Sequence, residues 1–194
     1  VEIENPYAAL ANGKAVEDPA MFFGRDNFIK EIIKSITHET QTKAIAIYGQ
    51  KRSGKSSVLH HLGKSLEEKG NCICASFSMG AAMGNPDSEF LWMLHKEIRD
   101  AYNENIKNEN EHLEKIPFRD FSTPNFWDFM DDVKSKIKKN CPEKRLVVLL
   151  DEFTYIYSAI KSNKLDESFM KVWKSILEKS FFSCVLVGQD VMPS

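Results

Sequence analysis

The chain has 194 residues, of which 42% are hydrophobic and 28% charged, and its formal net charge is −2. These values are ordinary for a soluble globular protein, and no apolar run approaches the roughly 20 residues that cross a bilayer, so membrane contact is not expected. The near-neutral charge excludes a surface that attracts polyanions as a whole, although local basic patches are compatible with it.

The first half of the chain predicts an arm, a helix, a strand and a second helix. Residues 1–25 contain two prolines and two glycines without a sustained hydrophobic period, which predicts an extended arm. A helix is predicted from Asp26, with an apolar face formed by Phe28, Ile29, Ile32, Ile33 and Ile36. The short apolar run 44–48 ends at Gly49 and favours a buried parallel strand, and the change of period after it predicts a helix over 55–69.

The second half repeats the alternation of strands and helices. Residues 72–77, 146–150 and 184–187 predict strands. Helices are predicted over 88–103, after Ser122-Thr123-Pro124, and between the last two strands, where the expected buried face is Phe169, Met170, Trp173, Ile176 and Leu177.

This order predicts an α/β fold: a three-layer sandwich with a mainly parallel P-loop sheet and helices on both faces. We expect residues 26–194 to form a single domain. The charged stretch 103–115 is expected to be a solvated helix end and loop. The five histidines form no spacing typical of a metal site, so they are expected on the surface or in packing.

One motif between the first strand and its helix carries most of the functional prediction. The sequence Gly49-Gln50-Lys51-Arg52-Ser53-Gly54-Lys55-Ser56 matches G-x-x-x-x-G-K-[ST]. Such a loop wraps phosphates with backbone N–H groups at a helix N-terminus. Lys55 is expected to bridge the β- and γ-phosphates, Ser56 to ligate Mg²⁺, and Ser57 to lie beside the nucleotide. Lys51 and Arg52 either add charge there or point to solvent.

Two adjacent acids follow the most apolar strand. Asp151 and Glu152 come directly after Leu150, at the edge of the sheet where open α/β sheets bind ligands. We expect Asp151 to hold Mg²⁺ through water and Glu152 to act as general base on the attacking water. An isolated pair of this kind is more often a solvated loop or a helix cap, but the phosphate loop upstream favours hydrolysis.

The segments GQKRSGKS, LVVLLDEF and CVLVGQD together resemble the additional-strand, catalytic-glutamate branch of P-loop ATPases, which includes the AAA+ and STAND groups. The opening NPYAALANGKAVEDPAMFFGRDNFIKEII is most similar to the lead-in of STAND proteins. That resemblance implies that Phe22, Phe23, Gly24 and Arg25 lie near the adenine and ribose. It also implies that Gln189, or alternatively Asp190, senses the γ-phosphate.

The same resemblance implies a sheet of five strands ordered 5-1-4-3-2, with the fifth strand, a helical lid and further domains of the parent chain beyond Ser194. STAND proteins are switches, in which ADP holds a closed state and nucleotide exchange permits a homo-oligomer. The leading hypothesis is therefore a module that binds Mg·ATP or ADP and hydrolyses ATP slowly, within a larger signalling or defence ATPase.

Two other hypotheses remain open. A nucleic-acid-dependent AAA+ ATPase, of initiator or repair type, is supported by a basic cluster of Lys134, Lys136, Lys138, Lys139, Lys144 and Arg145. A non-catalytic interaction module would keep nucleotide for stability but gives Glu152 no role. The absence of a guanine-reading motif favours ATP over GTP.

The four cysteines bear on the compartment. Cys72, Cys74, Cys141 and Cys184 contain neither a C-x-x-C pair nor a zinc-like spacing. We expect reduced thiols in a cytoplasmic protein. The chain begins at Val1 without a signal-peptide pattern, which we interpret as the start of an excised fragment.

Overall fold

The four predicted strands form one parallel sheet. The computed structural model describes residues 26–37, 42–50, 54–79, 87–163, 165–166 and 168–189. The strand order is β1-β4-β3-β2, and all three pairings are parallel. The strands are β1 (Ala44–Gly49), β2 (Cys72–Ser78), β3 (Arg145–Asp151) and β4 (Ser183–Gln189). The α/β prediction is confirmed, and the four strands follow the relative order 1-4-3-2 that the resemblance implied.

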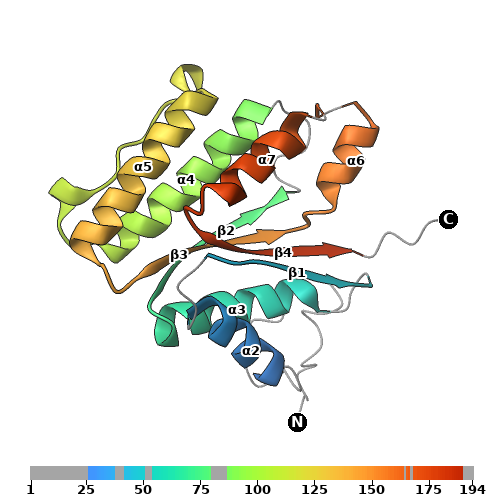
Figure 1. Cartoon of the computed structure of the whole chain (residues 1–194), viewed down its shortest axis with the longest axis horizontal. Coiled ribbons are helices and arrows are strands. Elements are labelled where there is room, and N and C mark those ends of the chain that lie inside the picture. The colour runs from blue at the N-terminus through green and yellow to red at the C-terminus, as the bar shows by residue number, and fades with distance from the viewer. Residues whose placement is uncertain are drawn as a thin grey trace, which may run out of the picture.

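Helices cover both faces of the sheet (Figure 1). On one face lie α2 (Asp26–Thr37) and α3 (Lys55–Lys69). On the other lie α4 (Asp87–Asn105), α5 (Thr123–Asn140), α6 (Tyr155–Lys161) and α7 (Ser168–Glu178). The sequence pattern did not predict α6. Within the described residues, no helix combines the length and the apolar content that crossing a bilayer requires.

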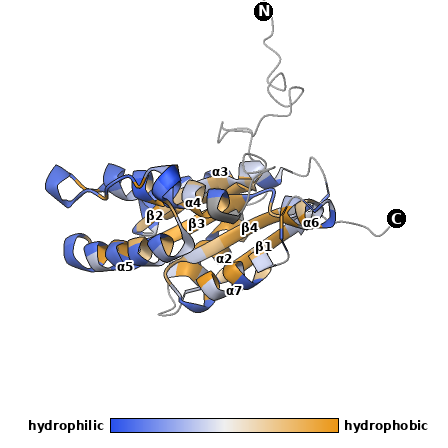
Figure 2. Cartoon of the chain, turned by 90° about the horizontal axis from the view of Figure 1, so that it is seen from above, coloured by the Kyte–Doolittle hydropathy of each residue, from blue (hydrophilic) through white to orange (hydrophobic). Residues whose placement is uncertain are grey.

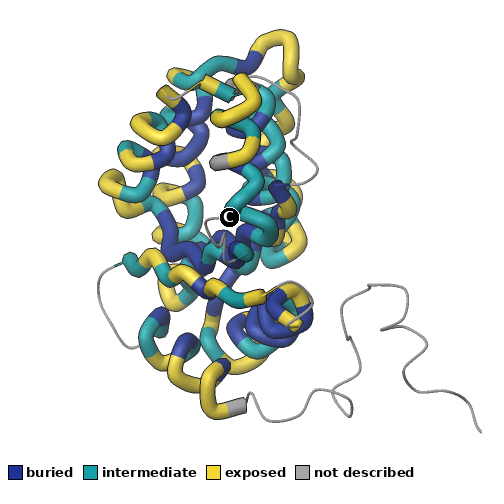
Figure 3. The backbone as a smooth tube through the Cα atoms, turned by 90° about the vertical axis from the view of Figure 1, so that its right-hand side faces the viewer, coloured by how far each residue is buried: buried dark blue, intermediate teal, exposed yellow. Residues whose placement is uncertain are grey.

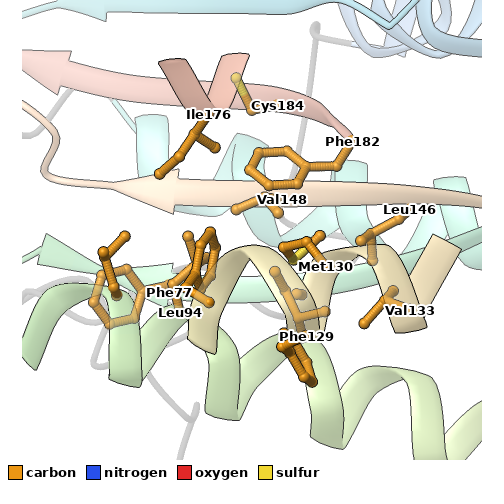
Figure 4. Packing of buried hydrophobic residues seen from close by; sticks show 14 of the residues in the cluster. Phe77, Leu94, Phe129, Met130, Val133, Leu146, Val148, Ile176, Phe182 and Cys184 are labelled. Atoms are coloured by element: carbon orange, nitrogen blue, oxygen red, sulfur yellow. The ribbon is translucent and has the colours of Figure 1, made fainter. Parts of the chain in front are cut away.

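The core has two layers because β3 is buried on both faces. Leu146, Val148 and Leu150 belong to the cluster formed with α4, α5 and α7, part of which Figure 4 shows. Val147 and Leu149 belong to the cluster formed with α2 and α3. Side chains alternate across a strand, so one continuous apolar run supplies both clusters. Figure 2 shows the resulting hydrophobic strands between helices whose outer surfaces are hydrophilic.

Two residues predicted on buried helix faces lie largely outside the core. Phe28 of α2 is 42% exposed and Met170 of α7 is 43% exposed. Each is a sequence neighbour of a buried residue, Ile29 and Phe169 respectively. Adjacent helical residues point in directions about 100° apart, and at these two places Ile29 and Phe169 take the direction that faces the core. Exposed positions accordingly follow the outer side of the helices in Figure 3.

Side-chain hydrogen bonds hold the connection between α4 and α5. It contains two short 3-10 turns, Glu109–Glu111 and Phe118–Asp120. The Asn103 side chain donates to the carbonyl of Leu113 and accepts from its N–H, and Trp92 Nε1 donates to the carbonyl of Ile116. Leu113 is buried by this arrangement. The predicted helix end and mostly exposed loop are present over 103–115, and Leu113 is the buried residue within them.

All four cysteines are free thiols. Burial raises the pKa of Cys72 to about 11 and that of Cys184 to about 12. Thiols with such pKa values stay protonated at neutral pH and are poor nucleophiles and poor metal ligands. The prediction of unpaired cysteines is confirmed.

His95 is a buried histidine on α4. Its side chain packs against the rings of Phe121 and Phe129, with centroid separations of 5.4 and 4.4 Å, and is fully inaccessible. Neither ring nitrogen makes a hydrogen bond of normal geometry to a described residue. Burial is the largest influence on its pKa and lowers it, opposed by the nearby backbone of Trp92 and Glu114. The imidazole is thus held neutral.

We predict that His95 makes folding stability fall at mildly acidic pH. Its folded pKa lies below the unfolded value of about 6.5, so the unfolded chain binds the extra proton. Its contribution is complete above that value and is lost as pH falls from there toward the folded pKa, with a slope of at most about 1.4 kcal/mol per pH unit. Urea unfolding of the wild type and of His95→Leu between pH 7.5 and 5 tests this. Parallel stability curves for the two proteins would contradict it.

Candidate functional site

The phosphate loop lies between β1 and α3, as predicted. Gly49 ends β1 and Lys55 begins α3, and Gly54 adopts a left-handed backbone with φ of 78°. A glycine takes that conformation without steric cost. Residues 51–53, which include the predicted contacts Lys51, Arg52 and Ser53, lie outside the described residues. The described ends of the loop nevertheless have the strand-to-helix placement that the motif requires.

Lys55 is a nearly buried cation held by its own loop. Its side chain is only 8% exposed, and Nζ donates to the carbonyl oxygens of Gly49 at 2.8 Å and of Gln50 at 2.6 Å. Two neutral oxygens satisfy part of the ammonium group's hydrogen bonding without cancelling its charge. Lys55 therefore places a positive charge beside Gly49 and Gln50, and an anion is a stronger partner for an ammonium group than a carbonyl oxygen is.

The N-terminus of α3 adds further donors beside Lys55. The first four N–H groups of any helix have no intrahelical acceptor, and Gly54 provides no side-chain cap. Ser56 is exposed and Ser57 is buried in this first turn. Uncapped N–H groups and the positive end of the helix dipole suit a bound anion. The residues present thus fit a phosphate group at this position.

The two predicted acids differ in their backbone geometry. Asp151 is the last residue of β3, whereas Glu152 has a left-handed backbone with φ of 57°. That conformation costs a non-glycine residue on the order of 1 kcal/mol and persists where neighbouring contacts fix it. The contacts are a hydrogen bond from the Glu152 N–H to Asp151 Oδ1 at 2.8 Å and one from Ser78 Oγ to Glu152 Oε2 at 3.0 Å.

The strand register brings these elements to one edge. Gly49 of β1 pairs with Gln189 of β4, and Asp151 of β3 pairs with Ser78 of β2. Because β4 lies between β1 and β3, the loop and the acids are separated by two strand spacings, or about 10 Å. That gap is filled by the end of β4. The parallel sheet therefore gathers the phosphate loop, Gln189 and the acids at its carboxyl edge.

A second contact joins the acidic turn to β4. The Thr154 hydroxyl accepts a hydrogen bond from the Gln189 N–H at 3.2 Å, and the Phe153 N–H donates to the carbonyl of Val187 at 2.8 Å. Gly188 lies under this turn: a Cβ atom there would stand 2.8 Å from Thr154 Cγ2. The close approach explains why a residue without a side chain occupies the last but one position of this strand.

Sequence analysis missed Ser78 and Thr154. Ser78 ends a strand that is otherwise mostly apolar, at the edge where ligands bind, and this placement is the signal that was available. Thr154 had no such signal, because its partner Gln189 is distant in sequence. Phe23, Arg25 and Asp190 lie outside the described residues, as do Phe22 and Gly24. Within the described residues, no group of three or more His, Cys, Asp or Glu side chains is placed to hold a metal ion.

Comparison with known proteins agrees with this geometry. Residues 22–189 match the model of a family described as an ATPase domain predominantly from Archaea. The chain belongs to this family. None of the curated proteins compared with it matches.

Two solved structures are similar in fold to this ATPase domain. Drosophila ORC bound to DNA has a TM-score of 0.51 at 14% identity over 90% of this chain and 39% of that chain. Cdc6p from Pyrobaculum aerophilum has a TM-score of 0.49 at 10% identity over 91% of this chain and 42% of that chain. The chain thus spans about two fifths of each structure. The likeness to ORC supports the α/β fold with a parallel sheet.

We predict that Gly188→Ala destabilises the fold through Thr154. The added methyl group meets Thr154 Cγ2 and, at 3.2 Å, the Tyr48 ring, and overpacking of this kind costs about 1–3 kcal/mol. Thr154→Ser removes the clashing methyl group and keeps the hydroxyl that accepts from Gln189. The double variant should therefore recover much of the loss in urea unfolding. A double variant no more stable than Gly188→Ala would show that Thr154 is not the obstacle.

Proposed function

We propose that this ATPase domain binds Mg·ATP and Mg·ADP at the carboxyl edge of its sheet and hydrolyses ATP. The observation that carries the proposal is the nearly buried Lys55 cation beside the uncapped N-terminus of α3. A phosphate chain satisfies both, because it accepts hydrogen bonds from the ammonium group and from the helix N–H groups. The family assignment supports the same chemistry.

Each side chain then has a distinct task. Lys55 exchanges its carbonyl partners for β- and γ-phosphate oxygens, and Ser56 and Asp151 hold Mg²⁺, Asp151 through water. When bound, Mg²⁺ neutralises phosphate charge and fixes the orientation of the phosphate oxygens. Gln189, next to Gly49 in the sheet register, is the proposed polar contact to the γ-phosphate. Phe23 and Arg25 are proposed to contact the adenosine.

Glu152 is the proposed general base. Its carboxylate accepts the proton of the attacking water, whose oxygen bonds to the γ-phosphorus while the bond from that phosphorus to the β–γ bridging oxygen breaks and ADP leaves. In the present geometry that carboxylate is bonded to Ser78 of β2, on the side of β3 away from β1. The serine hydroxyl therefore holds the proposed base in one position.

The role of the ATPase within a longer protein has two candidates. A nucleic-acid-dependent AAA+ ATPase is supported by the likeness to an ORC structure that contains DNA, and by Lys134 and Lys138, which are exposed on α5. Two other members of the basic cluster are engaged: Lys136 donates to the carbonyls of Glu111 and His112, and Lys139 to the Glu111 carboxylate. The Glu111 carboxylate offsets the charge of Lys139, whereas the carbonyl oxygens that hold Lys136 are neutral.

The second candidate is the STAND-like switch, in which the nucleotide sets the population of closed and assembled states rather than driving continuous turnover. Its support is the Phe-Phe-Gly-Arg element at residues 22–25 and its neighbours in the sequence. In that case further domains of the parent chain and a homo-oligomer are the partners. Slow hydrolysis with retained ADP distinguishes it from an ATPase that DNA stimulates.

Two variants test binding and hydrolysis separately. Lys55→Ala should weaken ATP and ADP binding by at least about tenfold in calorimetry with Mg²⁺, because a charged hydrogen bond is worth about 1.5–3 kcal/mol. Glu152→Gln should bind nucleotide as the wild type does and hydrolyse ATP about a hundredfold or more slowly. Unchanged hydrolysis in Glu152→Gln would remove that residue from the role of base, and binding unaffected in Lys55→Ala would refute the site.

The nucleic-acid hypothesis has its own test. Duplex DNA should bind in a salt-dependent manner, and Lys134→Glu with Lys138→Glu should abolish the binding, since each removes an exposed cation. Lys139→Glu is not a clean variant, because it also breaks the pair with Glu111. ATP hydrolysis measured with and without DNA completes the test. No binding at low salt would favour the switch.

A further inference from the structure

A cavity lies at the amino edge of the sheet, opposite the nucleotide site. It has a volume of about 260 Å³ and is lined where β3 and β4 begin, by residues that include Leu146, Phe182 and Ser183. Arg145 begins β3 and Asp151 ends it, so six residue steps, or about 20 Å, separate the cavity from the acids. A ligand here leaves the phosphate loop free.

The inner wall of the cavity is apolar. Leu146 and Phe182 are buried, and Figure 4 shows them beside Val133 and Met130 of α5. The half-buried Phe181 also lines the cavity, and its ring stacks on Trp127 with a centroid separation of 6.2 Å. A wall fixed by this packing offers a preformed surface to an apolar group.

The rim of the cavity is cationic. Lys134, Lys144 and Arg145 line it, and none of its described lining residues is acidic. Lys144 Nζ donates to Asn105 Oδ1 at 2.7 Å, and Arg145 Nη1 donates to the carbonyl of Ile36 at 3.0 Å. The Asn105 acceptor is neutral, so this bond orients the Lys144 ammonium group and leaves its charge in place.

Among the described acids, Glu67 and Glu143 lie near Lys144. Burial and Glu104 raise the pKa of Glu67, while Lys144 acts on it in the opposite direction. Burial and Glu143 raise the pKa of Cys141, and Lys144 acts in the opposite direction. Neither glutamate lines the cavity.

Ser183 adds a buried polar group. It is 4% exposed, and its hydroxyl oxygen accepts from the Lys43 N–H at 3.0 Å. Within the described part of the chain, no acceptor is bonded to the hydroxyl hydrogen. A buried hydroxyl keeps a donor for an oxygen ligand when its oxygen is already satisfied.

We propose that this cavity binds a small organic anion: an apolar or aromatic body that carries a carboxylate or a phosphate group. The body packs on Leu146, Phe181 and Phe182, and the anionic group meets the rim cations and the Ser183 hydroxyl. The volume lies just below the roughly 300–1,000 Å³ of pockets for drug-sized ligands, so the ligand is small. The site is independent of the proposed ATPase activity.

The test uses phenyl phosphate and benzoate as probes, followed by amide chemical shifts in ¹⁵N-labelled protein. The two probes have the same phenyl ring but carry different anionic groups. Their relative affinities therefore identify the preferred anionic group. Phenol is the uncharged control. Lys134→Gln removes a rim cation whose side chain is exposed, and Lys138→Gln removes an exposed cation one turn further along α5, outside the cavity lining.

At least one probe should shift the amides of Leu146, Phe182 and Ser183 saturably, with equal affinity for wild type and Lys138→Gln. Lys134→Gln should bind it about threefold to fivefold more weakly, the effect of one exposed charge. Shifts confined to Gly54–Ser57 would place the probe in the phosphate loop and overturn the proposal. So would equal shifts with phenol, equal affinities of the two lysine variants, or no saturable shift with either probe.

Discussion

The parallel pairing of β3 with β2 and β4 is the constraint on which the rest of the structure depends. β3 is buried on both faces, and its alternating side chains supply both layers of the core. Parallel strands place all their carboxyl ends at one edge and all their amino ends at the other. The fold therefore has two chemically different edges, one with the phosphate loop and the acids and one with the cationic cavity.

At the carboxyl edge, hydrogen bonds within the chain hold the charged side chains in position. Lys55 is kept by two carbonyls, and Glu152 is kept by Ser78 and by a strained backbone. A buried ammonium group and a fixed carboxylate are costly unless they are partnered, and these partners are ones that phosphate and water can replace. Stability and readiness for the proposed chemistry thus come from the same contacts.

The residues that link the site are those that long-range register brings together. Ser78 meets Glu152 because β2 pairs with β3, and Thr154 meets Gln189 because the turn after β3 crosses the end of β4. The two members of each pair are far apart in the sequence, so a local stretch around one does not contain the other. Short α6 was missed for a similar reason, since it follows that turn and has too few residues for a clear hydrophobic period.

The sequence by itself determined the four strands, their helices and the placement of the phosphate loop before α3, because hydrophobic period and glycine placement are local properties. It also placed Asp151 and Glu152 at a strand end. Only the tertiary structure decided which helical neighbour faces the core, which lysines of the basic cluster are engaged, and that Lys134, Lys144 and Arg145 share a cavity. These depend on packing between segments that are far apart in the chain, and single-sequence patterns do not contain that information.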